Sequence, residues 1–166
     1  MKFLGTIEAK VDTKGRVFLP STFRKALQAL GDEHLVLRKD VFQPCLTLYP
    51  ESVWNRQVDA LRQRLNRWNA AHQMLLRQFV ADVELLGLDA SGRLLLPRRY
   101  LRMAGIGQGL QFIGMDDTIE IWSDERGDKP FMSPADFSQA LQDVMGTEPP
   151  APSTPLISNT TETQQS

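Results

Sequence analysis

The chain has 166 residues, enough for one domain or two small ones, and it is 42% apolar and 23% charged, as globular proteins commonly are. It contains no apolar run near the ~20 residues that span a bilayer, no apolar signal-peptide core in its first ten residues, and one cysteine, Cys45, which cannot form an internal disulfide. These features argue against membrane and secreted proteins and favour a cytoplasmic location.

The net charge of −1 conceals an uneven distribution along the chain. Residues 1–104 contain 17 Lys and Arg against 10 Asp and Glu, whereas residues 105–166 contain 2 against 10. A basic first part favours a polyanionic partner, and the acidic remainder limits non-specific association. A solvated surface would produce the same split, so charge alone does not decide the partner.

Residues 1–50 predict two strands, a helix and two further strands around a turn at residues 12–15. The expected helix follows Pro20, with Ser21 as its N-cap and Gly31 as its stop. The extended segments are residues 3–11, 16–19, 34–39 and 45–50. The inward face of the helix would be Phe23, Ala26, Leu27 and Leu30.

Residues 51–79 predict a long helix or a helical hairpin broken at residues 66–70. Apolar residues recur there at spacings of three and four, which indicates a stripe that packs on the flanking strands or forms part of a subunit interface. The stripe comprises Trp54, Val58, Leu61, Leu65 and Trp68, continued with a different phase by Leu75, Leu76 and Phe79.

Residues 80–123 repeat the order of the first 50 residues: two strands around a turn, a short helix ending at Gly105, and two strands joined across Asp116 and Asp117. Residues 124–146 predict a loop and then a short helix, Pro134–Met145, with Phe137, Leu141 and Val144 or Met145 facing inward. Residues 147–166 are rich in Pro, Thr and Ser and are expected to be disordered.

A ten-residue motif occurs twice. The stretch "VDTKGRVFLP", residues 11–20, returns as "LDASGRLLLP", residues 88–97, at a constant offset of 77 positions. In both copies Asp can accept hydrogen bonds from amides two residues on, and Gly supplies the left-handed conformation that closes a turn. A tight hairpin turn explains the Asp and Gly, but not the Arg after each Gly. Repeated cations suit a repeated polyanion, and Arg can bind phosphate or read guanine.

The doubled motif, together with "FLG", "FRKAL", "CLTLYP" and "IEIW", resembles the MraZ family of bacterial regulators over roughly residues 1–123. The resemblance implies an α+β fold of two interleaved AbrB/SpoVT-like swapped-hairpin β-barrel repeats with a helical insertion between them. It implies a nucleoid-associated transcription factor that binds short direct repeats of double-stranded DNA in its own promoter, upstream of division and cell-wall genes. It also implies a ring-like homo-oligomer.

The resemblance assigns DNA contact to two loops. In the first loop, Asp12 shapes the turn and Thr13, Lys14, Gly15 and Arg16 face DNA. In the second loop, Asp89 shapes the turn and Ala90, Ser91, Gly92 and Arg93 match those positions. Ser91 lacks the charge of Lys14, so the second loop is expected to contribute less. Arg24, Lys25, Arg98, Arg99 and Arg102 are either auxiliary phosphate contacts or a solvated helix face.

No constellation of catalytic residues stands out. His34 and His72 lack metal-ligand spacing, Cys45 begins an apolar strand and reads as a small core residue, and no P-loop or Rossmann glycine pattern occurs. We therefore expect no enzyme activity, metal, cofactor, membrane association or small-molecule substrate. The alternatives are an oligomeric scaffold whose basic loops are incidental, and an antitoxin-type swapped-hairpin DNA binder.

Overall fold

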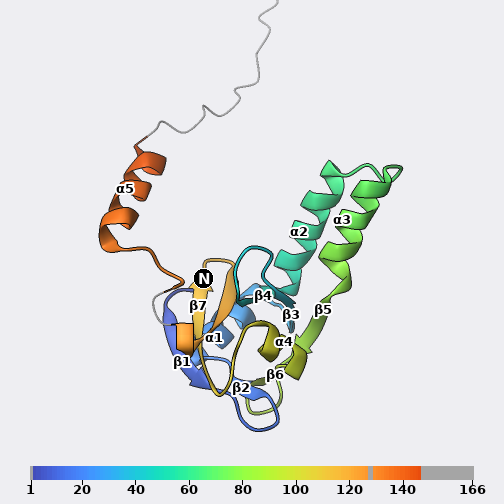
Figure 1. Ribbon diagram of the computed structural model, residues 1–166. Coiled ribbons are helices and arrows are strands. Elements are labelled where there is room, and N and C mark those ends of the chain that lie inside the picture. Colours follow the sequence, from blue (N-terminus) through green and yellow to red (C-terminus); the bar gives the residue numbers. More distant parts are fainter. Residues whose placement is uncertain (1, 127–128, 147–166) are drawn as a thin grey trace, which may run out of the picture. The chain divides into compact units, whose positions relative to one another are not determined.

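The structure is a computed structural model that describes residues 2–126 and 129–146. The chain divides into two compact units, Met1–Pro130 and Phe131–Ser166 (Figure 1). The first unit contains β1 (Thr6–Lys10), β2 (Arg16–Phe18), α1 (Ser21–Leu30), β3 (His34–Lys39), β4 (Leu46–Pro50), α2 (Glu51–Arg64), α3 (Ala70–Ala81), β5 (Val83–Gly87), β6 (Arg93–Leu95), α4 (Arg98–Met103), β7 (Gly109–Met115), β8 (Thr118–Ser123) and a 3-10 turn at Asp124–Arg126. The second unit contains α5 (Pro134–Met145).

The two sequence repeats share their sheets. A six-stranded antiparallel sheet has the order β1-β7-β8-β4-β3-β5, and β2 pairs with β6 in a separate two-stranded ribbon. The first strand of each repeat therefore lies beside the third strand of the other, β1 on β7 and β5 on β3. Neither repeat completes its hydrogen-bonded sheet alone, so the fold is a mixed α+β structure that needs both copies.

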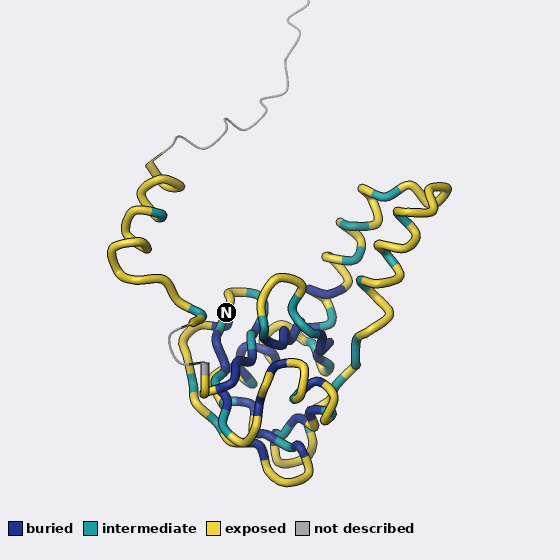
Figure 2. The backbone as a smooth tube through the Cα atoms, in the orientation of Figure 1, coloured by how far each residue is buried: buried dark blue, intermediate teal, exposed yellow. Residues whose placement is uncertain are grey.

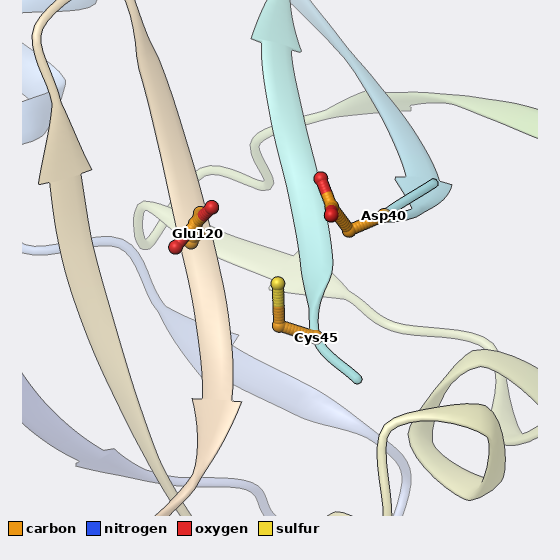
Figure 3. A group of neighbouring side chains, drawn as sticks. All are labelled: Asp40, Cys45 and Glu120. Carbon is orange, nitrogen blue, oxygen red and sulfur yellow. The ribbon is translucent and has the colours of Figure 1, made fainter. Parts of the chain in front are cut away.

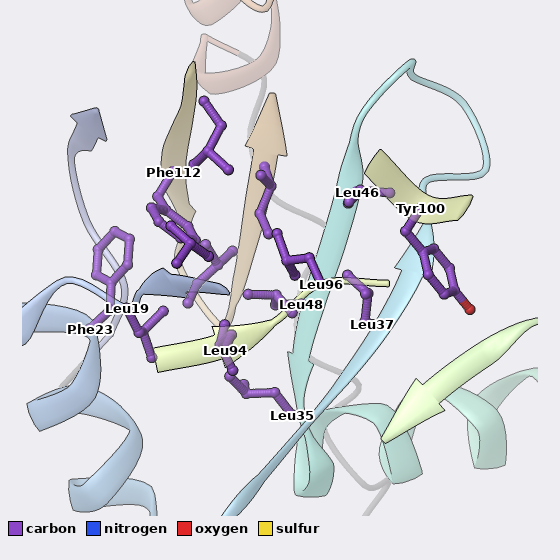
Figure 4. Close-up of a cluster of buried hydrophobic side chains, with 14 of the residues drawn as sticks. Leu19, Phe23, Leu35, Leu37, Leu46, Leu48, Leu94, Leu96, Tyr100 and Phe112 are labelled. Atoms are coloured by element: carbon purple, nitrogen blue, oxygen red, sulfur yellow. The ribbon is translucent and has the colours of Figure 1, made fainter. Parts of the chain in front are cut away.

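The main core draws on both repeats. Phe23 of α1 makes edge-on ring contacts with Phe3 and with Phe112 of β7, at centroid distances of 5.7 and 6.5 Å. Leucines from β3, β4 and the β6 region close the same core (Figure 4). This arrangement explains the apolar pattern of the repeated motif, because alternate residues of β2 and β6, Val17 and Leu94, point into the core and are buried.

Helix α1 differs in detail from the sequence prediction. Pro20 occupies the cap position without a side-chain cap, and Ser21 is the first helical residue, so Ser21 is not the N-cap. Phe23, Ala26 and Leu27 are buried as predicted, but Leu30, the last helical residue, is 45% exposed. Gly31 ends the helix in the left-handed conformation.

The central helices form a hairpin, α2 and α3, broken between residues 64 and 70 as the sequence indicates. Asn69 caps α3 by accepting from the amides of Ala71 and His72. Only the base of the hairpin packs on the strands, where the Trp54 ring stacks on Phe79 at 5.2 Å. The tip is exposed (Figure 2). Within the predicted stripe, packing on the strands is wrong for Trp68 and Leu75, which are 96% and 53% exposed, while the other members are buried or half-buried.

The described part of the second unit, residues 131–146, contains the single helix α5. Ser133 caps this helix, because its side chain accepts a hydrogen bond from the Asp136 amide. The helix forms where predicted, but its apolar residues do not face inward: Phe137, Leu141, Val144 and Met145 are all exposed. Residues 147–166, expected to be disordered, lie outside the described residues. Among the helices described, none is long and apolar enough to span a bilayer.

Candidate nucleic-acid interface

The first motif forms a closed loop around one carboxylate. Asp12 Oδ1 accepts from the amides of Lys14 and Arg16, both at 2.9 Å, and Asp12 Oδ2 accepts from Arg16 Nε at 2.7 Å. The Gly15 amide donates to the Asp12 carbonyl at 3.1 Å, and Gly15 has a φ of 88°, which only glycine adopts without strain. Thr13 and Lys14 are exposed at the tip.

The second motif forms the same loop. Asp89 Oδ1 accepts from the amides of Ser91 and Arg93 at 2.9 Å, Asp89 Oδ2 accepts from Arg93 Nε at 2.8 Å, and Gly92 has a φ of 84°. The carboxylates of Asp12 and Asp89 thus each accept three hydrogen bonds within their own turn. Ala90 and Ser91 are exposed at the tip.

The arginines have a part in the turn that the sequence did not indicate. Arg16 and Arg93 each close their loop by pairing Nε with the Asp carboxylate, so a structural turn does use the charge. Within the described residues, neither side chain forms a hydrogen bond through its two Nη groups. Each guanidinium is therefore held in place by Nε while its fork stays available for a ligand, the arrangement that bidentate recognition needs.

The antiparallel pair of β2 and β6 joins the two loops, one at each end of the ribbon. Leu96 donates its amide to the Gly15 carbonyl at 2.8 Å, and Leu19 donates to the Gly92 carbonyl at 3.1 Å. The ribbon register pairs Arg16 with Leu95 and Phe18 with Arg93.

The outer face of this ribbon has a mixed character. It presents two half-buried arginines and two apolar side chains, Phe18 at 58% and Leu95 at 55% exposure, while Val17 and Leu94 face the core. The Arg93 guanidinium lies over the Phe18 ring at 5.7 Å. Sequence reasoning missed Phe18 and Leu95, although strand alternation around the buried Val17 and Leu94 would have placed them outside.

The loop carboxylates are ionised under ordinary conditions. The hydrogen bond from the Arg16 amide, followed by those from the Arg16 side chain and the Lys14 amide, lowers the pKa of Asp12 below its ordinary 3.8. The amide and side chain of Arg93 and the amide of Ser91 lower the pKa of Asp89 in the same way. Each carboxylate thus keeps its charge and its hold on the arginine.

The cations of the short helices fall into two groups. Arg99 forms an ion pair with Asp82 at 2.6 Å and lies 3.8 Å from Glu84. The hydrogen bond to Asp82 is the main cause of the raised pKa of Arg99. Arg98 and Arg102 line a shallow hollow beside the first loop, together with Asp12, Thr13 and Gly15. Arg24 lies over Gly92 in the second loop.

A group of metal-ligand types also occurs. The ligand atoms of Asp40, Cys45 and Glu120 lie within 4.8 Å of one another (Figure 3). Burial, followed by the charges of Glu120 and Asp40, raises the pKa of the Cys45 thiol, and burial raises that of Glu120. A buried, protonated thiol is a poor metal ligand.

The carboxylates of this group already have partners. Asp40 accepts from the Phe42 and Gln43 amides and from Thr47 Oγ1, and Glu120 accepts from the Trp122 indole. The hydrogen bonds of Asp40 therefore stabilise the loop between β3 and β4, and Cys45 is a buried core residue, as predicted. The two histidines also have protein contacts, His34 with Glu51 and His72 with the Asn66 amide.

Similarity to known proteins extends across the loops, ribbon and helices. The family model described as "MraZ protein, putative antitoxin-like" matches residues 2–78 and 80–142. The chain is 61% identical over 147 residues to the transcriptional regulator MraZ of Phocaeicola vulgatus, covering 89% of this chain and 96% of that protein. It is 56% identical over 148 residues to that of Bacteroides thetaiotaomicron, covering 89% and 95%, and 35% identical over 144 residues to that of Flavobacterium psychrophilum, covering 86% and 91%. Since both loops fall inside the matched segments, and the similarity reaches from the first strand to α5, the chain belongs to the MraZ family.

Proposed function

We propose that the chain is a sequence-specific DNA-binding transcriptional regulator and not an enzyme. The observation that carries the proposal is the pair of loops, in which two arginines, each held by the Asp of its own loop, lie at diagonal positions on one outer face of the ribbon. The major groove of B-DNA admits a two-stranded ribbon, and Arg forks read guanine there. The relatives, each named a transcriptional regulator, support the same function.

Each loop residue has a distinct role in this proposal. Arg16 and Arg93 offer their Nη groups to base edges, and Lys14 contacts phosphate. Thr13 and Ser91 offer hydroxyl groups to phosphate oxygens, while Gly15 and Gly92 supply the positive φ that lets each loop present these side chains. On the outer face of the ribbon, Phe18 and Leu95 suit contact with thymine methyl groups.

The proposal includes the architecture and the assembly. The exchange of first strands between repeats supports a swapped-hairpin barrel of the AbrB-like kind, built from repeats 1–50 and 80–123. We propose a ring-like homo-oligomer that binds short direct repeats in its own promoter, at the division and cell-wall gene cluster, and so acts at the nucleoid. Exposed apolar side chains near the hairpin tip, Trp68, Met74 and Leu75, support contacts between subunits.

Binding to the upstream region of the chain's own gene tests the proposal. Few cations face DNA per chain, so several loops must act together, and arrays of repeats should bind far more tightly than one repeat. Arg16→Ala should weaken binding by about 5- to 150-fold for each chain that contacts the DNA, the equivalent of about 1–3 kcal/mol for one Arg–base contact. Arg16→Lys should also fail to restore binding, because a point charge lacks the bidentate fork.

The controls separate recognition from folding. Because Arg16 also closes its loop, each variant needs a thermal melt and a light-scattering measurement, where the parent should be several times the 18.8 kDa monomer. Arg77→Ala on α3 is the matched control, an exposed arginine outside both loops. If Arg16→Ala and Arg93→Ala both bind DNA like the parent, the loops are only turns and the scaffold alternative holds.

A further inference from the structure

The first loop borders a hollow that carries uncompensated positive charge. The hollow has a volume of about 540 Å³, with Asp12, Thr13 and Gly15 on one wall and Arg98 and Arg102 of α4 on the other. In the described part of the chain, no carboxylate forms an ion pair with either arginine. The Asp12 carboxylate contributes little competition for them, because the Lys14 and Arg16 amides and Arg16 Nε already occupy its oxygens.

The second loop receives a cation in a different way. The side chain of Arg24 lies so close over Gly92 that a Cβ placed there would collide with the guanidinium, whose Cζ would be 3.0 Å away. Arg24 is half-buried and, like the two arginines of α4, takes part in none of the ion pairs of the described residues. The position 77 residues later is Leu101, so this contact is not a copy of the first loop.

The strand exchange explains why each loop meets the helix of the other repeat. The Leu19 amide binds the Gly92 carbonyl, and α1 begins two residues after Leu19, so the first turn of α1 is carried onto the second loop. The Leu96 amide binds the Gly15 carbonyl, and α4 begins two residues after Leu96. The backbone therefore delivers Arg24 to the second loop and Arg98 and Arg102 to the first.

We propose that Arg24, Arg98 and Arg102 are phosphate-binding residues, each supplied to the loop of one repeat by the helix of the other. The proposal rests on the proposed DNA-binding function. Guanidinium groups without a carboxylate partner, next to a loop that faces DNA, suit the phosphodiester backbone, which proteins contact for register and affinity and not for base identity. The second loop has Ser91 where the first loop has Lys14, and Arg24 supplies the positive charge that is missing there. The two loops are therefore closer in DNA-binding strength than their sequences indicate.

Phosphate contacts leave a signature that base contacts do not. Each one displaces about one counterion, so the slope of log affinity against log salt changes by about 0.9 when it is lost. At 0.15 M salt this corresponds to about a fivefold loss of affinity for each contact, by the same relation. The loss applies to every duplex, whatever its sequence, because all duplexes have the same backbone.

The experiment measures affinity against NaCl concentration by fluorescence anisotropy, with the upstream duplex and a scrambled duplex of equal length. The variants of the full chain are Arg24→Gln, the double variant Arg98→Gln/Arg102→Gln, and the control Arg77→Gln. For each chain of the oligomer that contacts the duplex, we expect the slope to fall by about 1 for the single variant and by about 2 for the double variant, on both duplexes alike. The control should bind as the parent does, and thermal melts should match.

Two results would overturn the inference. The first is a parent-like slope and affinity for both test variants, and the second is a loss confined to the upstream duplex, which would make these arginines base-reading residues. Failure of the parent itself to bind either duplex would instead overturn the proposed function, and this inference with it. If the Arg77→Gln control lost as much DNA affinity as the test variants, the loss would be explained by net charge alone, and this too would count against the inference.

Discussion

Alanine at Gly15, Gly92 and Gly5 should separate backbone strain from steric overlap in the two loops. All three glycines have a similar positive φ, 88°, 84° and 89°, so alanine meets the same conformational penalty at each. Their surroundings differ. A Cβ at Gly15 would lie 2.7 Å from the Leu96 carbonyl oxygen, at Gly92 its nearest neighbours would be atoms of the Arg24 side chain, and at Gly5 it would meet nothing within 4 Å.

The expected losses follow from these distances. A left-handed alanine costs about 1–2 kcal/mol, and that is the whole cost at Gly5. At Gly92 the flexible end of Arg24 can move away, so the loss in the free energy of unfolding should stay near the same value. At Gly15 the obstacle is backbone of the neighbouring strand, and overpacking adds about 1–3 kcal/mol. Gly15→Ala should therefore lose about 2–5 kcal/mol in total.

Urea unfolding followed by circular dichroism would measure the three variants at one protein concentration, since an oligomer makes stability depend on concentration. DNA binding provides a second reading: Gly92→Ala displaces Arg24 and should lower the salt slope, whereas Gly5→Ala should not. Equal losses at Gly15 and Gly5 would refute the reasoning, because the overlap with Leu96 would then cost nothing. A larger loss at Gly92 than at Gly15 would refute it as well.

Two further predictions concern charge. The pKa values of Asp12 and Asp89 are lowered in the folded chain, so the stability that these carboxylates contribute is fully present above the ordinary value of 3.8 and is lost as the pH falls through the lowered values. The double variant Asp12→Asn/Asp89→Asn should therefore lose less stability than the parent when the pH falls below about 4. An unchanged dependence of stability on acid pH would contradict the loop hydrogen bonds. Arg38 is buried and stacks on Phe79 at 4.5 Å, and its Nη1 has no hydrogen-bond partner among the described residues. Arg38→Met should therefore leave the free energy of unfolding within about 1 kcal/mol of the parent or raise it, while Arg38→Ala should lose about 2–4 kcal/mol. Equal losses for the two variants, measured by tryptophan fluorescence in urea, would contradict this.

Local patterns predicted much of the molecule. The strand, turn and helix segments follow from strand alternation, glycine and proline positions and helical periodicity, and the break in the central helix follows from the phase change after residue 65. The turn chemistry of Asp12 and Gly15 also followed, because an Asx turn closes over neighbours in the chain. These features depend on contacts between residues about four positions apart or closer, so the local sequence is enough to predict them.

Errors arose where burial depends on a partner surface. The apolar stripe of α2 and the inward face of α5 have helical spacing, but the pattern does not say how much surface is available to cover it. Trp68 is exposed because the hairpin extends past the strands that cover Trp54. The Ser21 cap was wrong for a smaller reason, since Pro20 already supplied the extended residue before the helix.

By itself the sequence determined that one motif is used twice, that each copy forms an Asp- and Gly-closed turn with an arginine after it, and that the family is MraZ-like. Tertiary structure alone decided which strands exchange, which loop meets which helix, and which arginines are paired. Arg98, Arg99 and Arg102 are neighbours in sequence, yet only Arg99 reaches Asp82, while the other two border the first loop. The physical reason is that a long-range ion pair or a shared hollow depends on how distant segments cross in space, and hydrogen bonds between β2 and β6 fix that crossing.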